Sequence, residues 1–441
     1  DTLEEEMIED VRGVFSLSDF RCLHQRDGES IQKLLKGMDE KMAEKYPDGF
    51  GKDDIEYAEL DNDKVVLLNY TSGTTGFSKG VMLTGNNLAG NVMYGIELGV
   101  LYRGERELCF LPLAHAYSCA FNFLVPMAVG AHVYLLGKVP SPKILLKAFE
   151  EVKPNLILTV PLILEKIYKK MILPQLSKTT MKVALNIPLL DSRIYAQIRK
   201  KLVDAFGGRF REVIVGGAAM NEEVTNFLYK IKFPFTIGYG MTECGPIICS
   251  SRWETLKLAS CGKATSRMEV RIDSPDPETH AGEIVCRGMN MMLGYYKNPE
   301  ATAQIIDANG WLHTGDLGTL DEEGYVTVRG RSKNLLLTSS GQNIYPEEIE
   351  SKLNNMPYVA ESIIVQQNEK LVGLVYPDFD DAFAHGLNND DIERVMEENR
   401  VALNAELPAY SQIFKMKIYP EEFEKTPKKS IKRFLYQEAK G

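Results

Sequence analysis

The chain has 441 residues, of which 44% are hydrophobic, so it can bury a sizeable core divided among roughly two to four domains or subdomains. Its net charge is −10, with acidic and basic residues interspersed, which excludes the broad basic surface typical of nucleic-acid-binding proteins. Seven scattered cysteines contain no CxxC pair, so a disulfide framework and a zinc finger are not predicted.

The cysteines and the N-terminal stretch both indicate the cellular compartment of the protein. An odd number of cysteines with no CxxC pair fits a reducing environment, so we expect a cytoplasmic protein. The stretch DTLEEEMIEDVRG at 1–13 is acidic and lacks the basic-then-apolar layout of a signal peptide, so secretion is not expected.

Short apolar runs alternate with amphipathic segments before residue 260, which predicts parallel strands covered by helices, an α/β fold. Between the runs, SPKILLKAFEEV at 141–152 predicts a helix with Ser141 as its N-cap and Pro142 in its first turn. The runs expected to be strands are 64–70, 108–113, 132–136, 156–160 and 212–217.

One apolar stretch, at 119–136, is long enough to be tested as a membrane span. It contains Asn122, Pro126, Gly130 and His132, so we predict a buried helix that breaks into a core strand instead.

The pattern changes twice in the second half of the chain. From about residue 260, MEVRI, GEIVCRG and GYVTVRG alternate apolar and polar residues, which is typical of an antiparallel or barrel-like sheet. After 329–343, a helix beginning YPEEIE, two strand patterns and a second long helix predict a small α+β domain. We therefore expect a large N-terminal domain over 1–330, with the barrel-like subdomain from about 260, and a small α+β C-terminal domain over 331–441.

The stretch NYTSGTTGFSKGVMLT at 69–84 has the composition of a phosphate-binding loop. Nine of the residues 70–80 are Ser, Thr, Gly or Lys, and such loops offer backbone N–H groups, hydroxyls and a positive charge to phosphate oxygens. A Walker P-loop is excluded, because Gly73 is followed five residues later by Ser78. The alternative, a flexible linker, predicts neither Lys79 nor the two apolar flanks.

Residues 70–81 closely resemble the signature of the adenylate-forming (AMP-binding) superfamily, which includes acyl-CoA synthetases, nonribosomal peptide adenylation domains and luciferases. The resemblance implies that this loop binds the phosphates of ATP. The residues it assigns to that role are Thr71, Ser72, Gly73, Thr74, Thr75, Gly76 and Lys79.

Two further stretches are similar to nucleotide-binding motifs of the same superfamily. VIVGGAAM at 213–220 resembles the adenine-pocket stretch, and GYGMTECG at 238–245 resembles the Y-G-x-T-E motif. The resemblance implies that Gly217 and Ala218 line the adenine and that Tyr239, with Gly240 beside it, stacks on it. It also implies that Thr242 contacts the α-phosphate and that Glu243 helps to hold Mg²⁺. Joining a carboxylate to AMP needs such charge neutralisation, because one anion attacks another.

The segments GWLHTGDLG at 310–318 and RGRSKN at 329–334 resemble the ribose-binding motif and the interdomain hinge. Asp316 would accept hydrogen bonds from the ribose hydroxyls, although a carboxylate in a turn before Gly318 has the same local pattern. Arg331 would contact ribose or phosphate and Lys333 would occupy the hinge about which the small domain rotates, while Gly341 would border the pantetheine channel. His115 lies where relatives place a residue near the acyl site, and a core histidine is an equal alternative. His313 is given no role.

Two regions depart from the family pattern. In the C-terminal run EKTPKKSIKRFLY, Ser430 stands where relatives carry a lysine that bridges carboxylate and phosphate. We expect Lys429 to replace it, with Lys428 and Lys432 as alternatives; slowed adenylation or a replaced residue would also account for the serine. Only 68 residues precede Asn69, fewer than in relatives, so either a leading segment is absent from the sequence or this member is short.

The resemblance implies an enzyme that uses ATP and Mg²⁺ to activate a carboxylic acid as acyl-AMP and then transfers the acyl group to coenzyme A. A long-chain fatty acid is expected, because GMNMMLGYYKNPEAT at 288–302 and IKRFLY at 431–436 look like the fatty-acyl-CoA synthetase branch. The alternatives are a ligase that delivers the acyl group to a carrier protein and a module that binds acyl groups or nucleotides without catalysis. No nucleic-acid partner and no transmembrane segment are expected, and peripheral contact with a membrane is left open.

Overall fold

The computed structural model describes residues 11–16, 19, 21–26, 30–56, 59, 61–71, 78–138, 140–176, 178–187, 190–337, 342–425 and 431–436. The chain divides into two units, Asp1–Leu60 and Asp61–Gly441. In the first unit β1 (Gly13–Phe15) and β2 (Cys22–Gln25) pair antiparallel, and α2 (Ser30–Lys36), α3 (Met38–Lys45) and a short 3₁₀ turn (Lys52–Asp54) follow.

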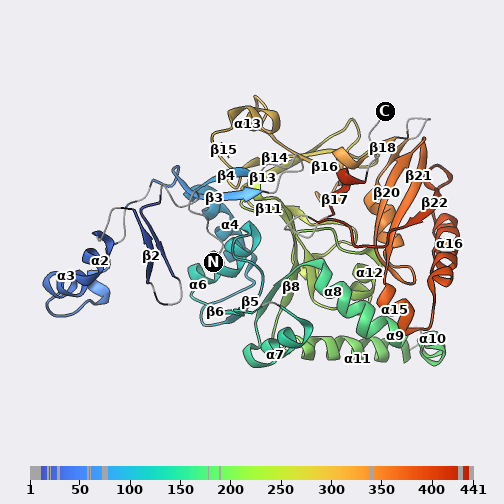
Figure 1. The fold of residues 1–441 in the computed structure, drawn as a ribbon, viewed down its shortest axis with the longest axis horizontal. Helices are drawn as coiled ribbons and strands as arrows, with labels where there is room; N and C mark the ends of the chain where they lie inside the picture. The colour runs from blue at the N-terminus through green and yellow to red at the C-terminus, as the bar shows by residue number, and fades with distance from the viewer. Residues whose placement is uncertain are drawn as a thin grey trace. The chain divides into compact units, whose positions relative to one another are not determined.

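A parallel five-stranded sheet organises the second unit, with helices on both of its faces, which confirms the predicted α/β class (Figure 1). Its strand order is β6-β5-β7-β8-β9. The strands are β5 (Arg106–Cys109), β6 (His132–Leu135), β7 (Leu156–Thr159), β8 (Glu212–Val215) and β9 (Phe235–Ile237).

Alternate residues of these strands enter two different cores, as the two-residue period of a strand requires. Ile157, Val213 and Val215 pack against one group of helices, whereas Leu156, Leu158 and Ile214 pack against the other. The first group is α7 (Pro142–Val152), α8 (Pro161–Ile167), the π-helical turn η3 (Tyr168–Ile172), α11 (Leu190–Ala205) and α12 (Glu222–Lys230). The second is α4 (Gly85–Leu98), the π-helical turn η2 (Cys119–Leu124) and α6 (Val125–Val129). The remaining helices of this region are α5 (Ala116–Ser118), α9 (Leu173–Leu176) and α10 (Thr179–Leu185).

The predicted N-cap of α7 is confirmed, because the Ser141 hydroxyl accepts a hydrogen bond from Ile144 N–H at 3.4 Å.

The first predicted strand belongs to a different sheet, which corrects the expectation that 64–70 joins the parallel layer. β3 (Val65–Thr71) pairs antiparallel with β4 (Lys79–Thr84) in a three-stranded sheet of order β15-β4-β3, where β15 is Gly294–Tyr295. Residues 72–78 are too few for the crossover that parallel neighbours need, so the chain returns antiparallel.

The apolar stretch at 119–136 forms η2 and α6 and then β6, so the predicted change from helix to strand is confirmed. The expectation of a core strand is wrong, because β6 is the edge of the sheet and its Leu135 is 64% exposed. Within the part of the chain that the structure describes, no helix combines the length and apolarity that crossing a membrane needs.

Antiparallel sheets follow, as the alternating pattern from about residue 260 predicts. One has the order β10-β11-β12 and the other β13-β14-β16-β17, and both contribute to one core that includes Ile248, Ile284 and Leu312. The strands are β10 (Tyr239–Gly240), β11 (Ile247–Ser250), β12 (Lys263–Ala264), β13 (Met268–Asp273), β14 (Gly282–Gly288), β16 (Leu312–Leu320) and β17 (Val326–Arg331). The helix α13 (Pro299–Ile305) lies between β15 and β16 in the sequence.

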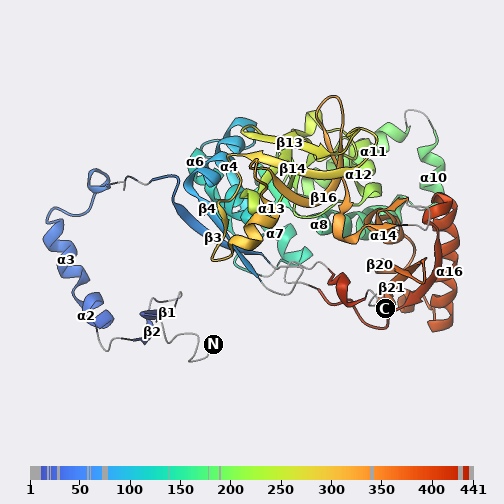
Figure 2. The same cartoon turned by 90° about the horizontal axis from the view of Figure 1, so that it is seen from above.

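The C-terminal part has its own core and the predicted α+β composition. Strands β20 (Val359–Gln367) and β21 (Lys370–Pro377) pair antiparallel, and β22 (Ile413–Ile418) joins β21 in parallel. Their helices are α14 (Pro346–Leu353), α15 (Phe379–Ala384), which the sequence did not predict, and α16 (Asn389–Glu406). Short strands β18 (Leu336–Leu337) and β19 (Asn343–Ile344) precede them. Seen from above, β20, β21 and α16 lie together at one end of the second unit (Figure 2).

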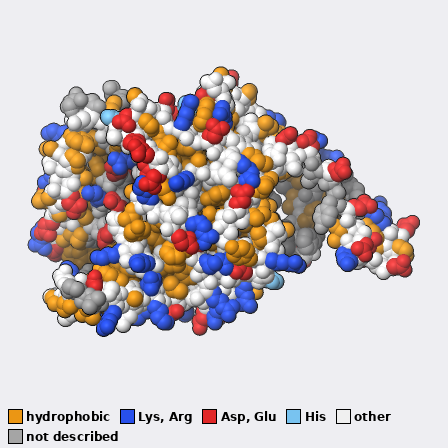
Figure 3. Space-filling view, turned by 180° about the vertical axis from the view of Figure 1, so that it is seen from behind, with side chains coloured by type: hydrophobic (Ala, Val, Ile, Leu, Met, Phe, Trp, Pro, Cys, Tyr) orange, Lys and Arg blue, Asp and Glu red, His pale blue; other side chains and the backbone are white. Residues whose placement is uncertain are grey.

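The surface of the second unit carries charges of both signs. Seen from behind, acidic and basic side chains are interspersed over it, in agreement with the sequence (Figure 3). The domain boundary expected near residue 330 falls within this second unit and stays a prediction.

Candidate functional site

A cavity of about 2950 Å³ opens at the carboxyl ends of strands β7, β8 and β9, where open parallel sheets usually bind ligands. Every predicted site residue that the structure describes lines this cavity. They are Thr71, Lys79, His115, Gly217, Ala218, Tyr239, Gly240, Thr242, Glu243, Asp316, Arg331 and Lys333.

Seven predicted site residues lie outside the described residues, namely Ser72, Gly73, Thr74, Thr75, Gly76, Gly341 and Lys429. Ser430 lies outside them as well. The ends of the predicted phosphate loop are described, and Thr71 of β3 pairs in register with Lys79 of β4. The antiparallel hairpin therefore brings both ends of the loop to the cavity wall.

Strand register also brings the two adenine-pocket stretches together. Val215 of β8 pairs with Ile237 of β9, and Gly217 and Tyr239 each follow two residues later. Both stretches thus leave the sheet side by side at its carboxyl edge. Gly217 has a φ of 87°, a conformation that glycine adopts without strain.

Asp316 lies in a polar cluster with two other predicted site residues. It is paired in register with Arg331 across β16 and β17, and Arg331 Nε lies 3.0 Å from Asp316 Oδ1. The Tyr239 hydroxyl donates to Asp316 Oδ2 at 2.8 Å. Burial raises the pKa of Asp316 above its ordinary value, although the Arg331 charge and the Tyr239 hydroxyl favour the ionised form.

Thr242 and Glu243 lie on a short 3₁₀ turn, Thr242–Cys244, directly after β10. Glu243 is only 8% exposed, and its Oε1 accepts a hydrogen bond from the Tyr295 hydroxyl at 2.7 Å. The ammonium group of Lys79 lies over the ring of the same tyrosine, 4.8 Å from its centroid. Tyr295 therefore connects the predicted phosphate-binding lysine to the predicted metal-binding glutamate.

Sequence reasoning missed Tyr295 as a site residue. Tyr295 reaches the site because it pairs on β15 with Val81 of β4, which lies two residues beyond Lys79. This pairing joins distant parts of the chain, so no local sequence pattern indicates it. Burial, together with the Glu243 charge, raises the pKa of Tyr295 far above its ordinary value, so its hydroxyl stays a donor.

The described residues bring no three metal-ligating side chains together. A single carboxylate such as Glu243 nevertheless fits Mg²⁺, since this ion usually keeps several waters and takes one or two carboxylates plus substrate phosphates. The donor set therefore suits a magnesium ion that is carried by a nucleotide.

Apolar side chains from both faces of the parallel sheet line part of the cavity. These walls offer an apolar group a surface to pack against. The side chains include Phe110, Leu111, Tyr117, Phe121, Leu145, Phe149, Ile163, Ile167, Ile172, Leu202 and Phe206. His115 stands at the start of α5, and its role stays a prediction.

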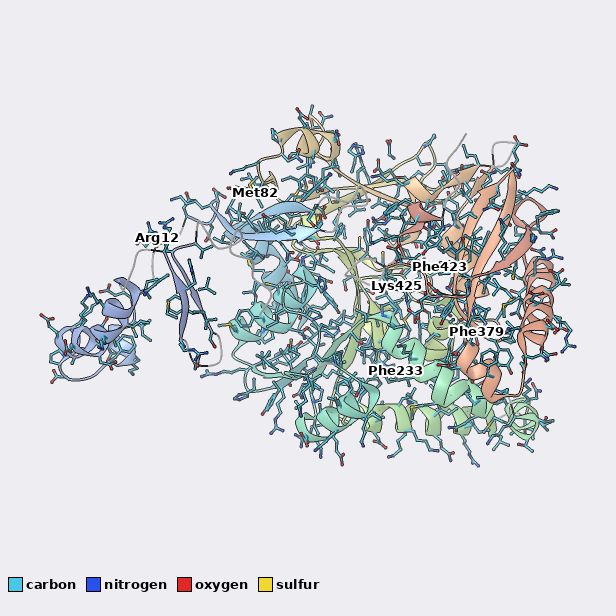
Figure 4. All side chains as sticks on the ribbon, viewed as in Figure 1. Arg12, Met82, Phe233, Phe379, Phe423 and Lys425 are labelled. Atoms are coloured by element: carbon cyan, nitrogen blue, oxygen red, sulfur yellow. The ribbon has the colours of Figure 1, made fainter. Side chains whose placement is uncertain are left out.

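The C-terminal segment also contributes to the cavity, since residues 431–434 line it. Arg433 Nη2 lies 2.6 Å from Glu350 Oε2 in a pair whose side chains are only 14% and 11% exposed, and Arg433 Nη1 donates to Ile364 O at 3.0 Å. Phe423, labelled in Figure 4, packs against β20 and β21 through Ile363 and Val372. These contacts hold both sides of the run in which Ser430 occurs.

Lys432 is the described member of the three candidate lysines near Ser430. It lines the cavity, and its ammonium group lies 3.1 Å from Glu424 Oε2.

Contacts also join α14 to β17, and the residues after α14 to Asn221 at the start of α12. Arg329 Nε lies 3.1 Å from Glu348 Oε1, and the side-chain amides of Asn221 and Asn355 bond to each other at 2.5 and 3.0 Å. Lys333 lies in the 3₁₀ turn Ser332–Asn334 between β17 and β18. The C-terminal part therefore closes one wall of the cavity.

Comparison with known proteins agrees with this arrangement. The profile of the family described as AMP-binding enzyme matches residues 10–296, and that of the AMP-binding enzyme C-terminal domain matches residues 333–439. The long-chain-fatty-acid–CoA ligase ACSBG2 of Gallus gallus is 29% identical over 364 residues, which are 76% of this chain and 47% of that protein. 4-coumarate:CoA ligase 1 of Petunia hybrida is 30% identical over 397 residues, 86% of this chain and 66% of that protein.

A solved structure shows the same fold. The O-succinylbenzoate coenzyme A synthetase of Bacillus subtilis, in complex with ATP and magnesium ion, has a TM-score of 0.66 and 24% identity, covering 86% of this chain and 72% of that one. The chain spans about half the length of several curated relatives it matches, with coverages of 47%, 53% and 52%.

Proposed function

Because the chain belongs to the AMP-binding enzyme family, we propose that it is an ATP-dependent acid–thiol ligase. It joins a carboxylic acid to AMP with release of pyrophosphate and then transfers the acyl group to coenzyme A. One observation carries the proposal: Lys79, Glu243 and Asp316, from three separate motifs, line one cavity whose lining also includes many apolar side chains.

The nucleotide is held at its two ends by different residues. Asp316 accepts hydrogen bonds from the ribose hydroxyls, each carboxylate oxygen having a further lone pair beside its contact with Arg331 or Tyr239. Gly217, Ala218 and Tyr239 border the adenine. Lys79 and the loop it ends bind the phosphates, and Thr242 donates to the α-phosphate.

In the first half-reaction an oxygen of the carboxylate attacks the α-phosphorus, and the bond from that phosphorus to pyrophosphate breaks. Lys79 and Thr242 lower the barrier by stabilising negative charge that grows on the phosphate oxygens. Magnesium, when bound through Glu243, supplies further charge neutralisation at the phosphates. The buried position of Glu243 and Asp316 strengthens these interactions, since little water competes.

In the second half-reaction the thiol sulfur of coenzyme A attacks the acyl carbon, and the bond from that carbon to the AMP oxygen breaks. We propose that the residues 331–441 form a mobile domain that rotates about Lys333 between the two steps, and that Gly341 borders the channel of the thiol arm. A lysine near Ser430, among Lys428, Lys429 and Lys432, neutralises the carboxylate and phosphate in the first step.

The acid is proposed to be a long-chain fatty acid. The apolar side chains of the cavity and the similarity to a long-chain-fatty-acid–CoA ligase support this choice. The similarity to a 4-coumarate:CoA ligase supports an aromatic acid instead, so chain length and ring content are the variables to test. The position of Ser430 favours the second candidate, a module that binds its ligands without adenylation.

Exchange of labelled pyrophosphate into ATP tests the first half-reaction, with fatty acids of graded length and 4-coumarate as substrates. We expect exchange that needs an acid and rises with chain length. Greater exchange with 4-coumarate would refute the fatty-acid assignment, and nucleotide binding without any exchange would favour the noncatalytic module. Exchange without thioester on adding coenzyme A would indicate a carrier-protein acceptor.

A further inference from the structure

Tyr295 touches two oppositely charged groups with two different parts of its side chain. Its ring face lies beneath the Lys79 ammonium group, 4.8 Å from the centroid, and its hydroxyl donates to Glu243 Oε1 at 2.7 Å. We propose that Tyr295 is a positioning residue that holds Lys79 and Glu243 apart, so that one is directed at the ATP phosphates and the other at the magnesium ion. The roles of Lys79 and Glu243 rest on the proposed function.

An ammonium group and a carboxylate that line one cavity attract each other. A direct ion pair between them would neutralise both charges before the nucleotide arrives, and the nucleotide would then have to break it. The tyrosine satisfies each group separately, because an aromatic face attracts a cation while a phenolic hydroxyl donates to an anion. Lys79 and Glu243 are thereby preorganised.

The backbone fixes the tyrosine in this place. Tyr295 is 6% exposed and its N–H donates to the Thr302 hydroxyl at 2.9 Å, while the next residue, Tyr296, donates its N–H to Gly80 O at 2.7 Å. Gly294 has a φ of 149°, and a Cβ there would lie 2.9 Å from Thr302 Cγ2, so the approach requires glycine.

The same segment also binds the backbone of Glu243. Met292 N–H donates to Glu243 O at 2.8 Å, so residues 292–295 contact Glu243 through both its main chain and its carboxylate. Because the neighbouring strand β4 carries Lys79, one short stretch determines the positions of both charged groups.

Two substitutions separate the contributions of the hydroxyl and the ring. Tyr295→Phe removes the donor to Glu243 and keeps the ring beneath Lys79, whereas Tyr295→Leu removes both. The matched control is Tyr296→Phe, at the adjacent residue, which is 45% exposed. Calorimetric titration of α,β-methylene-ATP into each protein, over a series of Mg²⁺ concentrations, measures binding without turnover.

We expect Tyr295→Phe to raise the Mg²⁺ concentration for half-maximal nucleotide binding about tenfold, as changes behind a metal ligand usually do, with little change in metal-free nucleotide affinity. Tyr295→Leu should weaken the metal-free affinity as well, since Lys79 loses its support. Tyr296→Phe should match the wild type.

An unchanged Mg²⁺ dependence in Tyr295→Phe would overturn the proposal, and so would a lowered melting temperature with unchanged Mg²⁺ dependence, which would mark a purely structural residue. The titration does not use turnover, so absence of pyrophosphate exchange in the wild type would refute the proposed function separately.

Discussion

Glu212 is a buried acid of β8 whose ionisation should make the stability of the protein depend on pH. Its side chain is fully buried, Oε1 accepts a hydrogen bond from Trp253 N–H at 2.6 Å, and Oε2 has no hydrogen-bond partner among the described residues. Burial raises the pKa of Glu212 from 4.5 to about 7, against the opposing effects of the Trp253 N–H and the Arg252 charge.

The size of the effect follows from these two values. The native state keeps the proton up to about pH 7, whereas the unfolded chain releases it above 4.5, so the stabilisation is complete at low pH and is lost as the pH rises between the two values. A difference of about 2.5 in pKa corresponds to about 3 kcal/mol, of which roughly 2 to 3 kcal/mol falls between pH 5 and pH 8.

Urea unfolding of the wild type and of Glu212→Gln at pH 5 and pH 8 measures this effect. Glutamine keeps an acceptor for Trp253 N–H and cannot ionise, so the variant should gain about 2 to 3 kcal/mol relative to the wild type on going from pH 5 to pH 8. The comparison isolates Glu212 from Glu107, a second buried acid whose pKa is also raised by burial. Glu398→Gln on α16, whose side chain is 69% exposed, is the control. An equal pH dependence in wild type and Glu212→Gln would refute the reasoning.

Further predictions concern the cavity and its C-terminal wall. Glu243→Ala and Lys79→Ala should each lower pyrophosphate exchange by orders of magnitude, because each removes charge stabilisation, while circular dichroism shows that the variants remain folded. Wild-type exchange rates would contradict the roles of these two residues. Asp316→Asn should weaken ATP binding, and wild-type affinity should fall as the pH drops through the raised pKa of Asp316, measured by titration calorimetry. Arg433→Met should lower the melting temperature by leaving Glu350 buried and unpaired, a loss of about 3 to 5 kcal/mol, whereas Arg394→Met, 68% exposed, should not. Among Lys428→Ala, Lys429→Ala and Lys432→Ala, one variant should lose adenylation, and equal activity in all three would mean that no lysine replaces the residue at Ser430.

Elements with a strong local sequence signal, such as an apolar run, an N-cap or a regular period, could be predicted from the sequence. The buried strands β7 and β8 are short apolar runs in the sequence. The start of α7 is marked by its N-cap Ser141 and by Pro142 in its first turn. The α+β part followed the same rule, since β20, β21 and α16 have regular strand and helix periods.

Pairing between distant strands was not predictable in this way. β3 is as apolar as a parallel core strand, yet it lies in an antiparallel sheet, because the number of residues before β4 decides the direction of return. Tyr295 and the Glu350–Arg433 pair likewise depend on long-range contacts that no spacing in the sequence encodes. Residues within the family motifs could be identified from the sequence by resemblance. The residues that position them, such as Tyr295, are identified only by the three-dimensional structure.

Isotope transfer from the acid to AMP tests the central claim most directly. If the carboxylate oxygen attacks the α-phosphorus and the thiol then breaks the acyl carbon–oxygen bond, one oxygen of the acid must remain in AMP. With a fatty acid labelled with ¹⁸O in its carboxylate, ATP and coenzyme A, mass spectrometry should show one ¹⁸O in AMP for each acyl-CoA formed. Unlabelled AMP, or ADP and phosphate as products, would contradict the account.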